Sequence, residues 1–207
     1  MSKVFVAAAV TLDGFMAGPN NSPANPMGDN ASKISSWLFK QRSFRQHLGI
    51  DDGGDTGKNN QITEETFNRI GANIMGNKMF KEGEAAWPEK APFGCPVFVL
   101  TKEQREPWVR PGGTTFYFTN ESLEAVLEKA KAVAGDKDVR ISGGGSVIQQ
   151  YINAGLVEEL LLHISPVFLG SGTRLLDGLD GQKNTLELIE AIGTPEVTHL
   201  RYVLKRS

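Results

Sequence analysis

The sequence predicts one α/β domain, built on a mixed, mostly parallel sheet of about eight strands flanked by helices. Apolar strand-like runs alternate with helical patterns along most of the chain, as in βαβ units. The last third instead predicts two strands joined by Gly-Thr-Pro-Glu, which indicates an antiparallel C-terminal hairpin. The length of 207 residues suits a single domain, 1–207, because no linker long enough to divide it is visible.

The first half of the chain predicts one central strand, two polar loops and two helices. Its expected elements are a strand at Val4–Val10, a mobile loop at 19–33, a helix at Ile34–His47, a solvated loop at 49–60, and a short helix capped by Thr63 that runs through Ile70 and is ended by Gly71. The first strand is almost wholly apolar, which is typical of a strand buried on both faces of a sheet.

The second half adds the remaining strands and the clearest amphipathic helix. Its expected elements are strands at 73–75, Pro96–Leu100, Thr114–Thr119 and Val139–Ile141, a helix from Asn120 to Gly135, a helix ended by Gly155, a long strand at Val157–Leu169, a loop at 170–184, and hairpin strands at Thr185–Ile192 and Val197–Lys205. The helix after Asn120 places Leu123, Val126, Leu127, Ala130 and Val133 on one face.

Composition excludes several classes of function. A net charge of −2 gives no reason to expect nucleic acid or an acidic membrane surface as a partner. The single cysteine, Cys95, excludes an internal disulfide, and three widely spaced histidines make a metal site unexpected. No signal-type segment opens the sequence, and no run reaches the roughly 18 apolar residues of a membrane span. We therefore expect a cytoplasmic globular protein.

A glycine turn at Gly143–Gly145 is the first functional candidate. It joins the strand that ends at Ile141 to a helical pattern that begins at Val147. Glycines let a ligand approach the backbone, and the N–H groups at a helix start attract anions, so a phosphate-bearing ligand is expected. The alternative is a strand–helix junction whose glycines only relieve crowding. Neither the G-x-G-x-x-G dinucleotide pattern nor the P-loop pattern is present.

Two other predicted strands end in similar groups. Gly76–Lys78 follows one of them, and Thr101–Lys102 follows the other. In open α/β sheets, ligands bind outside the carboxyl ends of the strands, so the three ends are expected to converge on one extended phosphate-rich ligand. No nucleophile–base set is recognisable, and no G-x-S-x-G turn marks one. If the protein is an enzyme, a cofactor is expected to carry the chemistry.

Asp13 and two aromatic residues complete the candidates. Asp13 follows the first buried strand, where a carboxylate can face a pocket, although Asp-Gly is also simply a good turn. Trp37 and Phe39 can line a pocket for a flat ligand or pack a helix onto the core.

Five segments in order resemble the dihydrofolate-reductase-like superfamily. They are Val-Thr-Leu-Asp-Gly-Phe-Met-Ala-Gly at 10–18, Ile-Met-Gly-Asn-Lys at 74–78, Phe-Val-Leu-Thr at 98–101, Ile-Ser-Gly-Gly-Gly-Ser-Val at 141–147, and Ile-Ser-Pro-Val-Phe-Leu-Gly-Ser-Gly at 164–172. Within the superfamily, the chain most resembles the reductase domain at the C-terminus of the bifunctional riboflavin-biosynthesis deaminase–reductase, in stand-alone form. The resemblance covers nearly the whole chain except the two polar loops.

This resemblance implies an NADPH-dependent reductase, usually a homodimer, acting on a small heterocycle of the pterin or ribosylamino-pyrimidine type. The implied coenzyme-binding residues are Ala8, Ala17, Gly18, Gly76, Asn77, Lys78, Thr101, Lys102, Ser142, Gly143, Gly144, Gly145, Ser146 and Val147. Asp13 is the implied catalytic residue, and it would face the substrate together with Trp37, Phe39 and Phe168. No metal is implied.

The chain departs from the family pattern in two places. Where the family has a Gly-Arg-x-Thr-like turn, this chain has Gly76-Asn77-Lys78-Met79, so the arginine fork and the threonine hydroxyl are absent. The deaminase half is also absent, because no H-x-E with P-C-x-x-C occurs. A non-catalytic NADP(H)- or nucleotide-binding protein that retains the cleft is therefore the alternative function.

Overall fold

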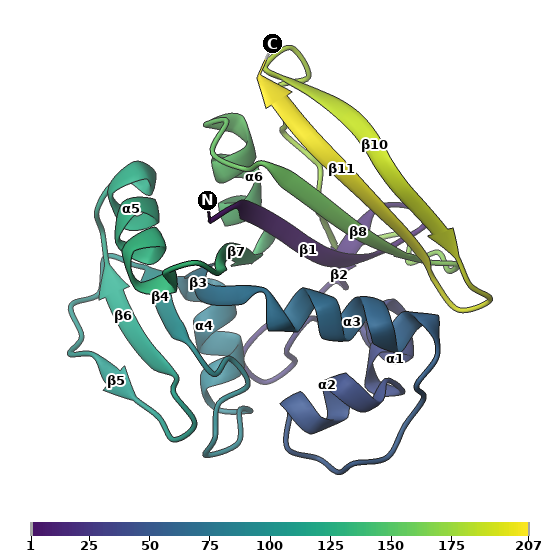
Figure 1. Ribbon diagram of the computed structural model, residues 1–207, viewed down its shortest axis with the longest axis horizontal. Helices are drawn as coiled ribbons and strands as arrows, with labels where there is room; N and C mark the ends of the chain where they lie inside the picture. The colour runs from purple at the N-terminus through teal and green to yellow at the C-terminus, as the bar shows by residue number, and fades with distance from the viewer. Residues whose placement is uncertain (1, 207) are drawn as a thin grey trace.

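The computed structural model describes residues 2–206 and contains a nine-stranded sheet and a separate two-stranded ribbon (Figure 1). In spatial order the large sheet consists of β10 (Asn184–Gly193), β11 (Thr198–Arg206), β8 (Glu159–Ser165), β1 (Val4–Thr11), β7 (Asp138–Gly143), β3 (Ile70–Gly76), β4 (Pro96–Leu100), β6 (Thr115–Thr119) and β5 (Trp108–Val109). The ribbon pairs β2 (Phe15–Ala17) with β9 (Thr173–Arg174). The helices are α1 (Ser32–Phe39), α2 (Arg42–His47), α3 (Lys58–Asn68), α4 (Asn77–Glu84), α5 (Leu123–Ala134) and α6 (Gly145–Asn153).

The predicted fold class is confirmed. Five strand pairs of the large sheet are parallel and three are antiparallel, and β10 and β11 form the expected C-terminal hairpin. The described sheet has nine strands rather than about eight, because Trp108–Val109 adds a two-residue edge strand that is too short to show a periodic pattern.

Helices cover both faces of the sheet. On one face, α5 and α6 pack against alternate residues of β1 and β7, including Val6 and Ile141. On the other face, Phe5 and Leu161 form a smaller cluster with Phe67 of α3, and Phe80 of α4 packs on Val97. β1 therefore lies in the middle of three layers, which explains why its sequence is apolar throughout.

The predicted helix Ile34–His47 is wrong as one element, because the chain breaks between α1 and α2. Gln41 has an extended backbone (φ −78°, ψ 132°) and forms a bridge with Asp55. The Gln41 side chain is buried, and its Nε2 donates to the Trp37 carbonyl. The bridge comes from a loop far along the chain, so the helical pattern of residues 34–47 gives no sign of the break.

The predicted loop at 49–60 and the predicted Thr63 cap are also wrong in part. The helix α3 already begins at Lys58 and ends at Asn68, and Gly71 lies inside β3. Thr63 lies in the middle of α3 and donates its hydroxyl to the Asn59 carbonyl at 2.7 Å. The buried side of the helix is polar, formed by Asn59, Asn60, Thr63 and Thr66. Hydrophobic periodicity cannot detect such a helix.

Two of the boundary differences in the second half have a clear physical reason. Ser122, rather than Asn120, caps α5, since its Oγ accepts from the Ala125 N–H at 3.2 Å; Gly135 ends that helix as predicted. The strand predicted at Val157–Leu169 covers only Glu159–Ser165 in β8, and Pro166 follows, which has no N–H to continue the ladder.

Candidate functional site

The three predicted strand ends meet at one edge of the sheet. β7, β3 and β4 are consecutive parallel neighbours, with Gly143 opposite Met75 and Leu100 opposite Gly76. The glycine turn, Gly76–Lys78 and Thr101–Lys102 therefore lie side by side, as the sequence predicts. The edge is the carboxyl edge of parallel strands, where α/β proteins bind ligands.

The glycine turn leaves open space at the start of α6. A Cβ added to Gly144 would meet no protein atom within 4 Å, whereas one added to Gly76 would lie 2.8 Å from Val147 Cγ2. Gly144 is the N-cap of α6, and the first N–H groups of a helix have no intrahelical acceptor. Open space beside these donors fits a phosphate-bearing group.

Two methionine thioethers border this turn. Cβ atoms added to Gly143 and Gly145 would lie 3.1 Å from Met79 Sδ and 3.0 Å from Met16 Sδ. The sequence shows that Met79 stands where the family turn has a threonine hydroxyl. It gives no sign of Met16 at this site, because β2 is only three residues long. Methionine is flexible, so the thioethers can move aside, but they donate no hydrogen bond to a phosphate.

Two lysines near this edge, Lys78 and Lys81, already have partners. Lys78 donates to Asn21 Oδ1 at 2.7 Å and lies 3.8 Å from Glu82, while Lys81 pairs with Glu103. Glu103 also accepts from Asn77 Nδ2 at 3.3 Å. Sequence reasoning missed Glu103, although it directly follows the predicted Thr101–Lys102 pair.

The other implied coenzyme residues differ in burial and in hydrogen bonding. Ser142 is buried and donates to Asn73 Oδ1 at 2.5 Å, and the Thr101 hydroxyl accepts from the Glu103 N–H at 3.1 Å. Ser146 and Lys102 are exposed. Ala8 lies inside β1, opposite Leu162.

The segment at Ala17–Gly18 is tightly enclosed. A Cβ on Gly18 would lie 1.9 Å from the Asp29 carbonyl oxygen, and one on Gly172 would lie 2.1 Å from the Ala17 carbonyl oxygen. Asp29 in turn accepts from Asn20 and Asn25. The predicted loop at 19–33 is thus folded onto the end of β2 by its own hydrogen bonds, and α1 begins at Ser32.

Asp13 joins two segments at the carboxyl ends of β1 and β8. Its carboxylate accepts from the Thr11 hydroxyl, from the Leu169 N–H at 3.1 Å and from the Gly170 N–H at 2.8 Å. The strand that was predicted to run to Leu169 ends at Ser165, and the turn after it directs these two N–H groups at Asp13. Arg174 donates to the Asp13 carbonyl at 2.7 Å.

These hydrogen bonds fix the charge of Asp13. Desolvation raises the pKa of the Asp13 carboxyl, but the hydrogen bonds from Thr11, Gly170 and Leu169 outweigh it and hold the pKa below its ordinary value. Asp13 is therefore an ionised hydrogen-bond acceptor at neutral pH, suited to orienting an N–H or O–H group rather than to storing a proton.

The three implied substrate-facing aromatics lie in different surroundings. Phe168 is 72% exposed, beside the segment held by Asp13, and Phe39 is 47% exposed at the end of α1. The Ser165 hydroxyl donates to the Ile34 carbonyl at 2.6 Å, which joins α1 to the end of β8. Trp37 is only 3% exposed, so it packs in the core and does not line an open surface.

Trp37 packs against two buried histidines. Its ring lies edge-on to His163 and His199, with ring centroids 5.4 and 5.2 Å away. His199 Nε2 lies 3.0 Å from Asn59 Oδ1, an acceptor, so the proton of His199 is on Nε2. His199 Nδ1 must then accept from His163 Nδ1, 2.8 Å away, and both rings are neutral.

We expect this pair to make stability depend on pH. Desolvation lowers the pKa of His163 to about 3 and that of His199 to about 4, from an ordinary 6.5. As pH falls, the two histidines take up protons in the unfolded chain before they do so in the folded protein. Their contribution to the free energy of unfolding is therefore fully present above pH 6.5 and is lost as pH falls toward 4 and then 3. Each histidine contributes a slope of up to about 1.4 kcal/mol per pH unit.

Urea unfolding at pH 7.5, 6.5, 5.8 and 5.0 measures this slope above the range in which ordinary carboxylates protonate. His47 also has a lowered pKa, so the variant His47→Gln is the matched control that retains the pair. A free energy of unfolding that stays constant from pH 6.5 to 5.0 would contradict the assignment of two neutral rings.

A cavity of about 370 Å³ lies away from the strand ends described above. It is bordered by Lys3, Asp138 and Glu159 at the amino ends of β1, β7 and β8, and by α3. Arg69 lines it as well and pairs with both carboxylates, so these charges satisfy one another. Within residues 2–206, no three His, Cys, Asp or Glu side chains gather to hold a metal ion. In the same part of the chain, no helix is both long and apolar enough to cross a membrane.

The sheet order and the helix-capping glycine turn at its carboxyl edge define a dihydrofolate-reductase-like fold. The chain belongs to the RibD C-terminal domain family, whose model matches residues 2–200.

The chain is similar to three other proteins over most of its length. The uncharacterized protein YyaP of Bacillus subtilis strain 168 is 27% identical over 183 residues, which cover 84% of this chain and 79% of that protein. The putative riboflavin biosynthesis protein of Shewanella sp. PV-4 superposes with a TM-score of 0.67 at 19% identity, with 100% of both chains covered. Dihydrofolate reductase of Enterococcus faecalis, complexed with NADP(H), gives a TM-score of 0.55 at 14% identity, covering 99% of this chain and 96% of that one. At these identities, the two structures show that the fold is shared.

Proposed function

We propose that the chain is a reductase that takes hydride from NADPH and transfers it to a small heterocycle of the pterin or ribosylamino-pyrimidine type, as in riboflavin biosynthesis. The observation that carries the proposal is the open space at Gly144, at the start of α6, on the edge where three parallel strands end. Membership of the RibD C-terminal family and the shared fold of an NADP(H)-binding reductase support it.

Different segments of the chain would hold different parts of the coenzyme. The N–H groups at the start of α6 would hold the pyrophosphate, and Lys78 and Lys102 would lie toward the adenosine end. The backbone at Ala17 and Gly18 would lie along the nicotinamide. When bound, the coenzyme supplies the hydride, and the protein supplies position and exclusion of water.

Asp13 would orient the substrate. Its carboxylate is ionised and held by three donors, so it can accept a further hydrogen bond from a ring N–H or a sugar O–H without reorganising. Phe168 follows the end of β8 and Phe39 ends α1; both are exposed and would offer flat apolar surfaces for a heterocycle.

A second candidate is a non-catalytic NADP(H)- or nucleotide-binding protein that retains the cleft. The specific observation in its favour is the pair of thioethers, Met16 and Met79, that border the glycine turn where hydroxyl donors would favour a phosphate. Both candidates require coenzyme binding, and they differ in whether NADPH is consumed.

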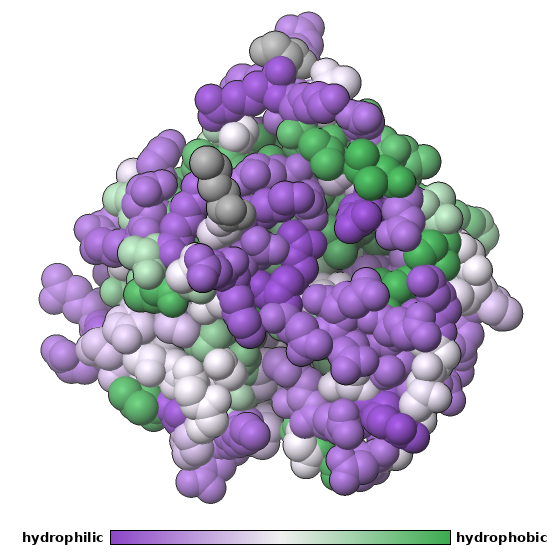
Figure 2. Space-filling view, viewed as in Figure 1, coloured by the Kyte–Doolittle hydropathy of each residue, from purple (hydrophilic) through white to green (hydrophobic). Residues whose placement is uncertain are grey.

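We also infer a homodimer, as the family resemblance implies. Leu186, Leu188 and Ile189 are each about half exposed on the edge strand β10, and apolar side chains gather over this hairpin in Figure 2. An exposed apolar edge strand is a surface with which another chain can pair. A molar mass in solution of twice 22.5 kDa tests this inference.

The function is tested first by titrating the purified protein with NADPH and following nicotinamide fluorescence. Saturable binding is expected, followed by loss of NADPH absorbance when a dihydropterin or a ribosylamino-pyrimidine is added. Binding without consumption of NADPH across the substrate panel would favour the second candidate. Absence of binding would overturn both.

A further inference from the structure

The end of β4 places a carboxylate against the start of α4. Glu103 follows Thr101–Lys102, and its Oε1 accepts from both Asn77 Nδ2 and Lys81 Nζ. The Glu103 backbone N–H donates to the Thr101 hydroxyl at 3.1 Å, which fixes the turn that carries the side chain. The hydrogen bonds from Lys81 and Asn77 hold the pKa of Glu103 below its ordinary value, so it is charged at neutral pH.

Three bases near Glu103 have acidic partners, and Lys102 is an exposed fourth base next to it in the chain. Lys81 pairs with Glu103, Lys78 lies within 3.8 Å of Glu82, and Arg105 pairs with Glu84 at 2.7 Å. The surface at the ends of β3 and β4 is therefore nearly balanced in charge, not the cationic surface that a phosphate monoester prefers.

A dinucleotide with its pyrophosphate at the start of α6 must extend along the strand ends. The end of β3 lies directly beside that of β7, and the end of β4 lies beside that of β3. The bases near Glu103 lie on this side of the glycine turn. An adenosine ribose that reached this side would meet the Asn77–Glu103 pair. A carboxylate accepts a hydrogen bond from a ribose 2′-hydroxyl, as acidic residues do in dinucleotide-binding folds, and it repels a 2′-phosphate.

We propose that Glu103 sets the choice of coenzyme, so that the protein binds NADH about as tightly as NADPH. This inference rests on the proposed function, because it places the adenosine of the same coenzyme. A 2′-phosphate that takes Lys81 as its partner draws it away from Glu103, and the Glu103 carboxylate then lies unpaired beside the phosphate. A 2′-hydroxyl leaves the Lys81–Glu103 pair intact.

The test compares dissociation constants for NADPH and NADH in the wild-type protein and in Glu103→Gln. The wild-type constants are expected to lie within about threefold of each other. The variant keeps a carbonyl acceptor but removes the charge, so it should bind NADPH about tenfold more tightly and NADH slightly less tightly. The gain for NADPH should shrink in high salt, because screening weakens the repulsion that the substitution removes.

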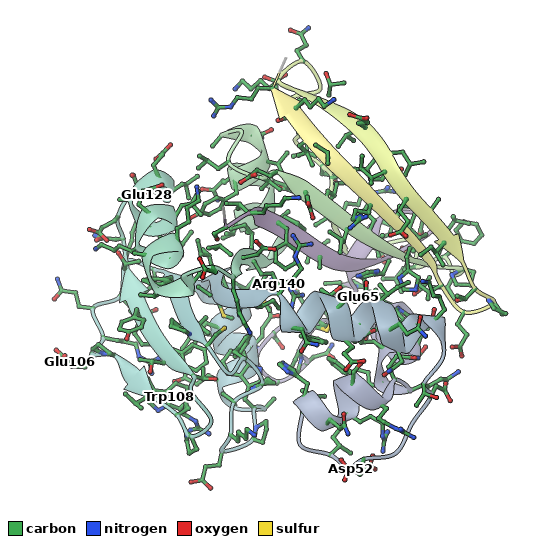
Figure 3. The ribbon with its side chains drawn as sticks, in the orientation of Figure 1. Asp52, Glu65, Glu106, Trp108, Glu128 and Arg140 are labelled. Atoms are coloured by element: carbon green, nitrogen blue, oxygen red, sulfur yellow. The ribbon has the colours of Figure 1, made fainter. Side chains whose placement is uncertain are left out.

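Glu106→Gln is the matched control. Glu106 lies on the loop before β5 and points away from the body of the protein (Figure 3). The Glu106→Gln substitution removes the same charge three residues further along the chain. It should leave the ratio of the NADPH and NADH dissociation constants unchanged.

The failure of this inference differs from that of the proposed function. A wild-type preference for NADPH of thirtyfold or more would overturn the role of Glu103 and leave the reductase assignment intact, as would an unchanged ratio in Glu103→Gln. Equal shifts in both control and variant would also overturn it, because the effect would then come from net charge. If the wild-type protein binds neither coenzyme, both proposals fail.

Discussion

Replacing Ser146 by glutamate is expected to weaken NADPH binding at least a hundredfold while leaving the fold intact. Ser146 is exposed in the first turn of α6, beside the open space at Gly144. A carboxylate there would occupy the place of the pyrophosphate and repel it. The same carboxylate interacts favourably with the helix dipole, so the melting temperature should stay equal or rise slightly.

Two measurements decide this prediction, fluorescence titration with NADPH and thermal unfolding. Ser146→Ala is the matched control, since it removes the hydroxyl without adding charge, and its loss of affinity should stay below about tenfold. A Ser146→Glu protein that binds NADPH like the wild type would show that the start of α6 does not hold the pyrophosphate.

Replacing Asp13 by asparagine is expected to lower turnover about a hundredfold and to leave the NADPH dissociation constant within about threefold. Asparagine is similar in size and keeps one oxygen, but it loses the charge that would orient the substrate. Single-turnover rates with the best substrate, alongside NADPH titration, measure the two effects separately. An unchanged rate would remove Asp13 from the mechanism.

Because Asp13 also holds Leu169 and Gly170, a purely structural effect must be separated from an effect on the substrate. Asp52→Asn, on an exposed loop at the far lower edge in Figure 3, controls for the substitution itself. Thr11→Val supplies an independent readout: it removes a hydrogen bond that lowers the pKa of Asp13, so the acid limb of the rate–pH profile should move to higher pH. A profile that does not move would indicate that Asp13 acts only through the fold.

The sequence by itself determined the fold class and the meeting of the strand ends at which the candidate site lies. The apolar run of β1, the glycine turn before α6 and the hairpin of β10 and β11 are local patterns whose periods and turn residues read directly as structure. The meeting of three strand ends followed from the parallel arrangement alone, because such strands share one edge.

Tertiary structure alone decided the details that depend on partners distant in sequence. The break at Gln41 needs Asp55, the early start of α3 needs a site that buries amide and hydroxyl groups, and Asp13 meets N–H groups 156 and 157 residues away. Glu103 gained its place beside Asn77 because β3 and β4 are neighbours. Hydrophobic periodicity shows which face of an element is buried, but it does not show which polar groups meet there, because that depends on the packing of the whole chain.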